Sequence, residues 1–220
     1  MSFSLSNDWD KIQTSNSFNT FPSQWKYKWG IHPINAQMMY NALIIHKPSS
    51  IVETGTFEGH GVYVMAKALS DTNTPCTIHT IDYDGDPLTA EDAAAWKELR
   101  EIRNSNLERI HSLFPLVTIN FYDGDSREVL PSLIQKGLTW DFFFQDSMHF
   151  LDGITKEWEI MESAANPNAI VVFDDISLSD NLKHPDAPVF CNQFINSIYG
   201  QKWCYKSTDI GHRQFWAQKK

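Results

Sequence analysis

The sequence has few cysteines and no long apolar run. Its three cysteines, Cys76, Cys191 and Cys204, are widely spaced, and none belongs to the CxxC pair that is typical of zinc and redox sites. No window approaches the roughly 20 consecutive apolar residues that cross a bilayer. The first residues lack the basic region and apolar stretch of a secretory signal. We therefore expect a cytoplasmic protein that does not interact with membranes.

Positive charge is also scarce. The chain has 18 Lys and Arg residues against 27 Asp and Glu residues, which gives a formal net charge of -9. Proteins that bind an extended phosphate backbone usually present a basic face, so we do not expect nucleic acid as a partner. A small molecule is the expected partner, and homo-oligomer formation is left open.

The length and apolar content favour one domain. With 220 residues and 42% hydrophobic content, the chain has the size of a single α/β domain, which we place at residues 33–220. Residues 1–32 mix polar and aromatic side chains without a sustained period, which indicates an N-terminal arm or cap. Its aromatic residues Trp25, Tyr27 and Trp29 either close over a substrate or pack on the outer helices or a second copy.

Short β-branched and aromatic runs alternate with helical stretches along this domain, which is the pattern of a parallel sheet covered on both faces. The runs at residues 142–144 and 170–173 are apolar throughout, so we place these two strands at the centre of the sheet. The predicted strands are Ser50–Glu53, Cys76–Asp82, Val117–Asp123, Trp140–Gln145 and Ala169–Asp174. The predicted helices are Pro33–His46, Gly61–Leu69, Ala90–Phe114, Ser126–Lys136, Gly153–Ser163 and Pro188–Tyr199.

The end of the chain follows a different pattern. The segments Lys202–Ser207 and His212–Gln218 flank a loop at Thr208–Gly211 that suits an antiparallel hairpin. The predicted fold is therefore α/β and doubly wound, with a mostly parallel sheet that ends in a C-terminal antiparallel hairpin.

Acidic residues stand at the ends of the predicted strands. Ligands of open α/β sheets bind beyond the carboxyl ends of the strands, where helix N-termini present free N–H groups. In this chain, that edge carries Glu53, Asp82, Asp125, Asp146, Asp174 and Asp175.

The loop after the first strand is a candidate binding element. Gly55 and Gly59 let the backbone turn closely around a ligand before the next helix begins. The GxGxxG pattern of a dinucleotide-binding loop is missing, and Glu53 would repel a pyrophosphate while suiting a positively charged ligand. Asp82, at the end of the second strand, is placed to accept hydrogen bonds from two ribose hydroxyls.

These residues resemble the first motif and the second-strand acid of the class I S-adenosylmethionine-dependent methyltransferases. The resemblance covers about residues 51–218 and implies a Rossmann-like, seven-stranded sheet. It also implies that Asp125 and Ser126 lie near the adenine of S-adenosyl-L-methionine. The remaining cofactor-binding residues that it implies are Glu53, Gly55, Thr56, Gly59, Asp82 and Asp146.

A closer resemblance is to the metal-dependent, macrocin-type sugar O-methyltransferases. The segment Asp146-Ser147-Met148-His149 resembles their metal aspartate with a base three residues later, and Asp174-Asp175 resembles their second metal pair. The chain departs from these relatives at Gly61, where they often carry serine, and at residues 145–149, where they usually carry Asp-Gly-x-His.

The residues support a metal site independently of this resemblance. If the fourth and fifth strands are neighbours, Asp146, Asp174 and Asp175 converge, and their carboxylates repel each other unless they are neutralised. Mg²⁺ or another divalent cation prefers such oxygen ligands. Alternatively, the aspartates cap helices or bind backbone amides.

The predicted reaction is divalent-metal-assisted transfer of a methyl group to a hydroxyl oxygen of a sugar, natural product or catechol-like acceptor by direct displacement. Asp146 and His149 are the predicted catalytic residues, with His149 as the general base that removes the hydroxyl proton. Alternatively, His149 has no catalytic role and is a surface or helix-capping residue. The alternative functions are metal-independent N- or O-methyl transfer, an NAD-dependent oxidoreductase and an inactive binding module.

Overall fold

The computed structural model describes residues 4–14, 31–83, 89–179, 184–209 and 213–220. The strands are β1 (Ser50–Thr54), β2 (Cys76–Asp82), β3 (Val117–Asp123), β4 (Trp140–Gln145), β5 (Ala165–Asp174), β6 (Trp203–Thr208) and β7 (Gln214–Lys219). The helices are α1 (Leu5–Thr14), α2 (Pro33–His46), α3 (His60–Asp71), α4 (Ala90–Leu113), α5 (Ser126–Gln135), α6 (Leu151–Glu162), α7 (Ala187–Asn196) and α8 (Ile198–Lys202). None of these helices is both long and apolar enough to cross a membrane.

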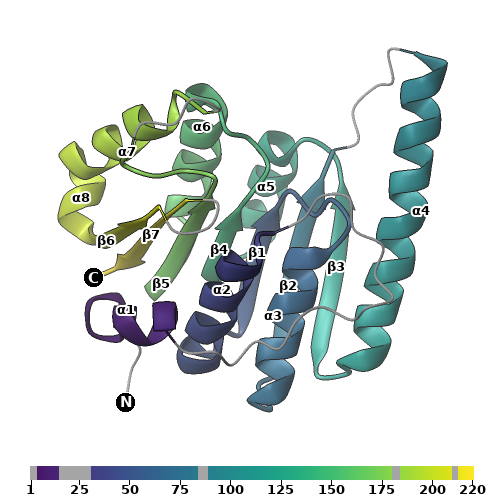
Figure 1. The fold of residues 1–220 in the computed structure, drawn as a ribbon, viewed down its shortest axis with the longest axis horizontal. Coiled ribbons are helices and arrows are strands. Elements are labelled where there is room, and N and C mark those ends of the chain that lie inside the picture. Colours follow the sequence, from purple (N-terminus) through teal and green to yellow (C-terminus); the bar gives the residue numbers. More distant parts are fainter. Residues whose placement is uncertain (1–3, 15–30, 84–88, 180–183, 210–212) are drawn as a thin grey trace.

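All the strands form one sheet with the order β3-β2-β1-β4-β5-β7-β6 (Figure 1). The first five strands in this order run parallel, whereas β7 is antiparallel to both β5 and β6. The predicted α/β class, the Rossmann-like seven-stranded sheet and the C-terminal hairpin are therefore confirmed. The fourth and fifth strands of the chain are neighbours, as the metal hypothesis requires.

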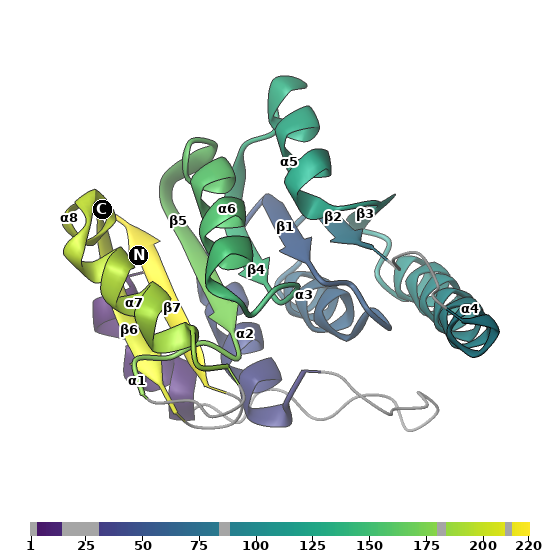
Figure 2. The ribbon, with the colours of Figure 1, turned by 90° about the horizontal axis from the view of Figure 1, so that it is seen from above.

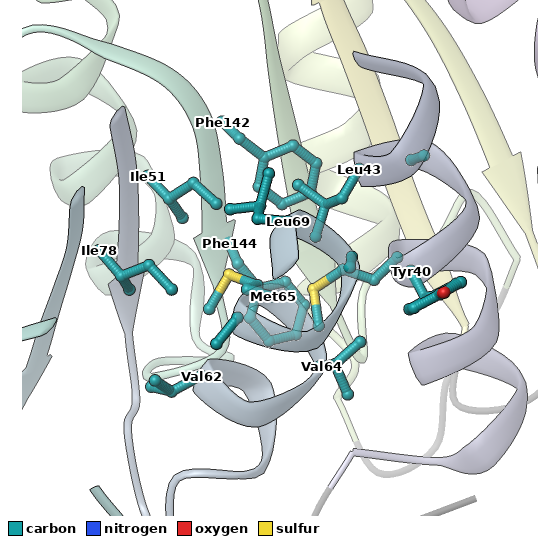
Figure 3. Close-up of a cluster of buried hydrophobic side chains, with 14 of the residues drawn as sticks. Tyr40, Leu43, Ile51, Val62, Val64, Met65, Leu69, Ile78, Phe142 and Phe144 are labelled. Carbon is teal, nitrogen blue, oxygen red and sulfur yellow. The ribbon is translucent and has the colours of Figure 1, made fainter. Parts of the chain in front are cut away.

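Helices cover both faces of the sheet, as Figure 2 shows. Because side chains alternate along a strand, Phe142 and Phe144 of β4 pack in the core under α2 and α3, where they meet Leu43 and Met65 (Figure 3). Phe143, between them, belongs to the core of the opposite face, which α5, α6 and α7 cover. Burial on both faces explains why the central strands are apolar throughout.

The N-terminal segment contains a helix that its irregular pattern does not predict. The helix α1 buries Leu5 and Ile12. The Leu5 N–H donates to Oε1 of Gln218 at 2.7 Å, and the carbonyl of Ile12 accepts from Nδ2 of Asn41 at 2.8 Å. Part of the predicted arm is therefore packed into the fold. Trp25, Tyr27 and Trp29 lie outside the described residues.

The predicted helix Pro188–Tyr199 is wrong in one respect, because the structure divides it into α7 and α8. The break falls at Ser197, whose backbone is extended (φ -94°, ψ -175°). Its hydroxyl oxygen accepts a hydrogen bond from the N–H of Tyr199 at 3.1 Å and so caps α8. Serine competes in this way with helix continuation, and helical periodicity alone does not reveal the break.

Trp158 of α6 lies in the core between the sheet and the helices α5, α6 and α7, and it is 1% exposed. Its ring centroid lies 4.9 Å from that of Trp203 and 5.3 Å from that of Phe194. We expect Trp158→Ala to lower the free energy of unfolding by about 3–5 kcal/mol, because it leaves a large cavity. Urea denaturation measures this loss. The control is Ile198→Ala, at a residue that is 57% exposed, which should change the free energy of unfolding by less than about 0.5 kcal/mol. Equal losses in the two variants would contradict the placement of Trp158 in the core.

Candidate functional site

A cavity of about 660 Å³ lies beyond the carboxyl ends of β1, β2, β4 and β5 and at the loop after β3. Eight of the predicted site residues line it, namely Gly55, Thr56, Asp82, Asp125, Ser126, Asp146, Asp174 and Asp175. Glu53, Gly59 and His149 are not among the lining residues. The sheet thus brings most of the predicted residues to one place, as expected for strand ends in an open α/β sheet.

Gly55 allows the loops after β1 and β4 to approach closely. Its φ is +90°, and a Cβ at this position would lie 2.3 Å from the carbonyl oxygen of Asp146. Any side chain would therefore push the two loops apart. Gly59 also has a positive φ, +87°, and is the N-cap residue of α3. The two glycines are required by the turn itself.

Glu53 lies beneath the cavity rather than in its wall. Its side chain is buried, and the Thr80 hydroxyl donates to its Oε2 at 2.5 Å. A Cβ on Gly61 would lie 2.0 Å from Oε1 of Glu53, so glycine at the start of α3 leaves room for this carboxylate. A serine at position 61 would therefore displace the Glu53 carboxylate. Burial raises the pKa of Glu53 to about 8.

Asp82 is held in a fixed orientation at the end of β2. Its Oδ2 accepts from the N–H of Phe57 at 2.6 Å, and its Oδ1 accepts from the N–H of Tyr83 at 2.9 Å. Arg103 of α4 pairs with Oδ2 at 3.3 Å and is itself only 2% exposed. Its guanidinium carbon also lies 4.4 Å from the Phe121 ring centroid. Arg103 escaped prediction because it stands among many charged residues of a helix.

Asp125 caps the N-terminus of α5. Its Oδ1 accepts from the N–H of Arg127 at 2.8 Å, and its Oδ2 pairs with Nη2 of Arg127 at 2.6 Å. Hydrogen bonding by Arg127 lowers the pKa of Asp125. Ser126, which follows it, is the first residue of α5 and is buried. A helix N-terminus with this cap forms the wall of the cavity after β3.

The end of the cavity at β4 and β5 carries three aspartates, Asp146, Asp174 and Asp175. Burial raises the pKa of Asp146 well above its ordinary value, and repulsion by Asp174 and Asp175 adds to this. Burial raises the pKa of Asp174 to about 7. Its Oδ1 accepts from Nδ2 of Asn35 at 2.7 Å and from Nε2 of Gln214 at 2.6 Å. Neutral amides therefore partly offset the buried charge.

These carboxylates do not fit a metal ion as they are arranged. In the part of the chain that the structure describes, no three His, Cys, Asp or Glu side chains form a group that could hold one. Oδ1 of Asp174 is already bonded to two amides, and Oδ2 of Asp175 lies 3.6 Å from Nε2 of His184. The metal role of Asp146, Asp174 and Asp175 stays a prediction.

Three histidines lie at or beside the cavity. His149 is half-buried on the loop after β4, and its ring centroid lies 4.6 Å from that of His184. His184 escaped prediction because it follows no strand end and reaches Asp175 only through the fold. His60 lines the cavity, and burial lowers its pKa to about 4, so that it is neutral at pH 7.

Sequence comparison identifies a family for this chain. The model of a family described as a methyltransferase domain matches residues 52–176, which is more than half of the chain. The matched region runs from β1 to the residues just after β5 and so contains most of the cavity. No curated protein matches the sequence.

Many solved structures share the fold. The O-methyltransferase TomG from Streptomyces achromogenes, solved in complex with S-adenosylmethionine, is 18% identical, with a TM-score of 0.64 over 86% of this chain and 81% of that chain. An O-methyltransferase from Bacillus cereus in complex with S-adenosylhomocysteine is 15% identical, with a TM-score of 0.63 over 98% of this chain and 90% of that chain. A putative caffeoyl-CoA O-methyltransferase from Staphylococcus aureus is 14% identical, with a TM-score of 0.63 over 87% and 86%. At these identities, the similarity shows the fold.

The close approach at Gly55 can be tested against Gly137, which has a similar φ of +93° but no atom within 4 Å of an added Cβ. An L-residue at such a φ costs about 1–2 kcal/mol, and we expect Gly137→Ala to lose this amount of unfolding free energy. Gly55→Ala should lose clearly more, because its Cβ also collides with the carbonyl of Asp146. Denaturant unfolding measures both losses, and equal values would contradict the proposed contact.

Burial of Glu53 makes stability depend on pH. Because its pKa rises from 4.5 in the unfolded chain to about 8 in the fold, the folded state retains a proton that the unfolded state releases. This contribution is complete below pH 4.5 and is lost as the pH rises through about 8. We expect the wild type to lose stability relative to Glu53→Gln between pH 5.5 and 8.5. Parallel pH profiles of the unfolding free energy for the two proteins would refute this.

Proposed function

This chain belongs to the methyltransferase-domain family, and we propose that it transfers a methyl group from S-adenosyl-L-methionine to a hydroxyl oxygen of a small molecule. One observation carries the proposal. The cavity joins the glycine loop after β1, the oriented carboxylate of Asp82 and the acidic end at Asp146 in one continuous wall. This order of groups suits a ligand with a ribose at one end and positive charge at the other.

The lining residues fit S-adenosyl-L-methionine. Asp82 would accept hydrogen bonds from the ribose hydroxyls, and Asp125 and Ser126 would lie along the adenine. Gly55 and Thr56 would hold the methionine part beside Asp146, whose charged form the sulfonium and ammonium groups would stabilise. When bound, this molecule supplies an activated methyl group.

The contribution of the chain to the transfer is positioning and proton removal. Ile31, Phe57 and Met148 add apolar surface to the cavity, which suits the carbon frame of an acceptor. His149 would remove the hydroxyl proton at the acidic end, because it lies on the loop that carries Asp146. Its ring must turn toward the cavity for this, and catalytic hydrogen bonds often form only in the complex with substrate.

A divalent cation that assists the transfer is the second candidate. The observation in its favour is that Asp146, Asp174 and Asp175 line the same end of the cavity and repel one another. Against it stand the amide bonds of Asp174 and the position of His184 beside Asp175. The transfer proposed above is therefore derived without a metal.

An activity assay tests both candidates. The protein, incubated with S-adenosyl-L-methionine labelled in its methyl group and a set of sugars, catechols and other small alcohols, should label an acceptor at oxygen. We expect turnover to persist after treatment with EDTA, because two protein amides already donate to Oδ1 of Asp174 and His184 lies beside Asp175. Loss in EDTA with recovery on addition of Mg²⁺ would establish the second candidate. Label on nitrogen alone would contradict O-methylation.

His149→Ala tests the base. We expect the transfer rate to fall at least about a hundredfold, because general base catalysis contributes that much, while the affinity for S-adenosylhomocysteine stays unchanged. His79→Ala is the control, since His79 lies within β2 next to Tyr122 and not on the loop that carries Asp146. An equal fall in rate and in affinity would move His149 from the role of base to that of structural support.

A further inference from the structure

Glu157 of α6 is a completely buried carboxylate, with 0% exposure, to which the proposed transfer assigns no role. Its oxygens accept four hydrogen bonds, all from neutral side chains. Burial raises the pKa of Glu157, and these hydrogen bonds oppose the rise. Placing a carboxylate in such a position is costly, so its contacts call for an explanation.

The four donors come from different parts of the site. Thr54 ends β1 and donates to Oε2 of Glu157 at 3.3 Å, and Gln145 ends β4 and donates to the same atom at 2.9 Å. Ser147, on the loop after β4, donates to Oε1 at 2.7 Å. Ser126, the first residue of α5, donates to Oε1 as well. One carboxylate thus joins two strand ends, a loop and a helix N-terminus.

Two of these donors belong to residues that line the cavity. Ser126 lines the cavity beside Asp125, and Ser147 lines it beside Asp146. Nε2 of Gln145 also donates to the carbonyl of Met148 at 2.8 Å, so the network extends along the loop that carries His149. Glu157 itself does not line the cavity and would not touch a ligand there.

We propose that Glu157 is a positioning residue that holds the start of α5 and the loop after β4 in the arrangement that binds S-adenosyl-L-methionine. The inference rests on the proposed function, because it concerns the same cavity. Without this carboxylate, Ser126 and the loop at Ser147 lose their common anchor. Ordering them on binding then costs free energy, which appears as a lower affinity.

The alternative is that Glu157 only stabilises the fold. Asp141 provides a matched control, because it lies on the same strand as Gln145 but at the opposite end of β4, away from the cavity. It also accepts four hydrogen bonds, two from backbone N–H groups at Ser49 and Ser50, one from the Ser49 hydroxyl and one from the Asn166 amide. Glu157 on α6 and Asp141 on β4 are therefore carboxylates with the same number of hydrogen bonds, one beside the cavity and one away from it.

The test uses Glu157→Gln, which keeps the size of the side chain. If the new amide nitrogen takes the place of Oε2, it faces the amide nitrogen of Gln145, and two donors then oppose each other. Gln145 cannot turn its amide to accept this bond without losing its own hydrogen bond to the carbonyl of Met148. We expect the dissociation constant of S-adenosylhomocysteine, measured by calorimetry at a temperature where the variant is folded, to rise about tenfold. Asp141→Asn should lower the melting temperature and leave the dissociation constant within about twofold.

The outcomes separate the two proposals. A dissociation constant for Glu157→Gln within twofold of wild type, or an equal rise in Asp141→Asn, would overturn the positioning role. A wild type that does not bind S-adenosylhomocysteine would overturn the proposed function and this inference with it. If Glu157→Gln does not fold, Thr54→Val removes one donor outside the cavity. It should raise the constant about threefold, and an unchanged constant would count against the inference.

Discussion

Crowding of acidic side chains at the carboxyl edge of the sheet is the constraint on which the site depends. The parallel strands bring Glu53, Asp82, Asp146 and Asp174 to one edge, where burial raises the pKa values of Glu53, Asp146 and Asp174 and so disfavours their negative charge. Hydroxyls, amides and one buried arginine offset part of this charge. A ligand with a sulfonium and an ammonium group offsets more of it, which relates the electrostatics of the edge to the family of the chain.

The charge is distributed unevenly along the cavity, and this gives the ligand a direction. Asp82 and Asp125 each pair with an arginine, whereas neutral amides hold Asp174 and repulsion persists around Asp146. A molecule with a neutral nucleoside and a cationic tail therefore gains most when its tail points toward Asp146. The close contact between Gly55 and the Asp146 carbonyl fixes the two loops that form this end.

The strands and the strand-end acids could be predicted because their signals are local. β2, β3 and β4 begin and end where their β-branched and aromatic runs do, and the acids follow from the ends of those runs. The helix α1, by contrast, depends on contacts with α2 and β7 that the sequence does not reveal. Arg103, His184 and Glu157 reach the site only through tertiary packing. Periodicity identifies the face of a helix, but not the atoms that this face meets.

Binding of S-adenosyl-L-methionine is the central claim, and calorimetric titration tests it most directly. The protein should bind S-adenosyl-L-methionine and S-adenosylhomocysteine at one site per chain. It should not bind NAD, because the loop after β1 lacks the GxGxxG pattern that binds a pyrophosphate and the acidic residue Glu53 lies beneath this loop. Tight binding of NAD without any response to S-adenosyl-L-methionine would contradict the account.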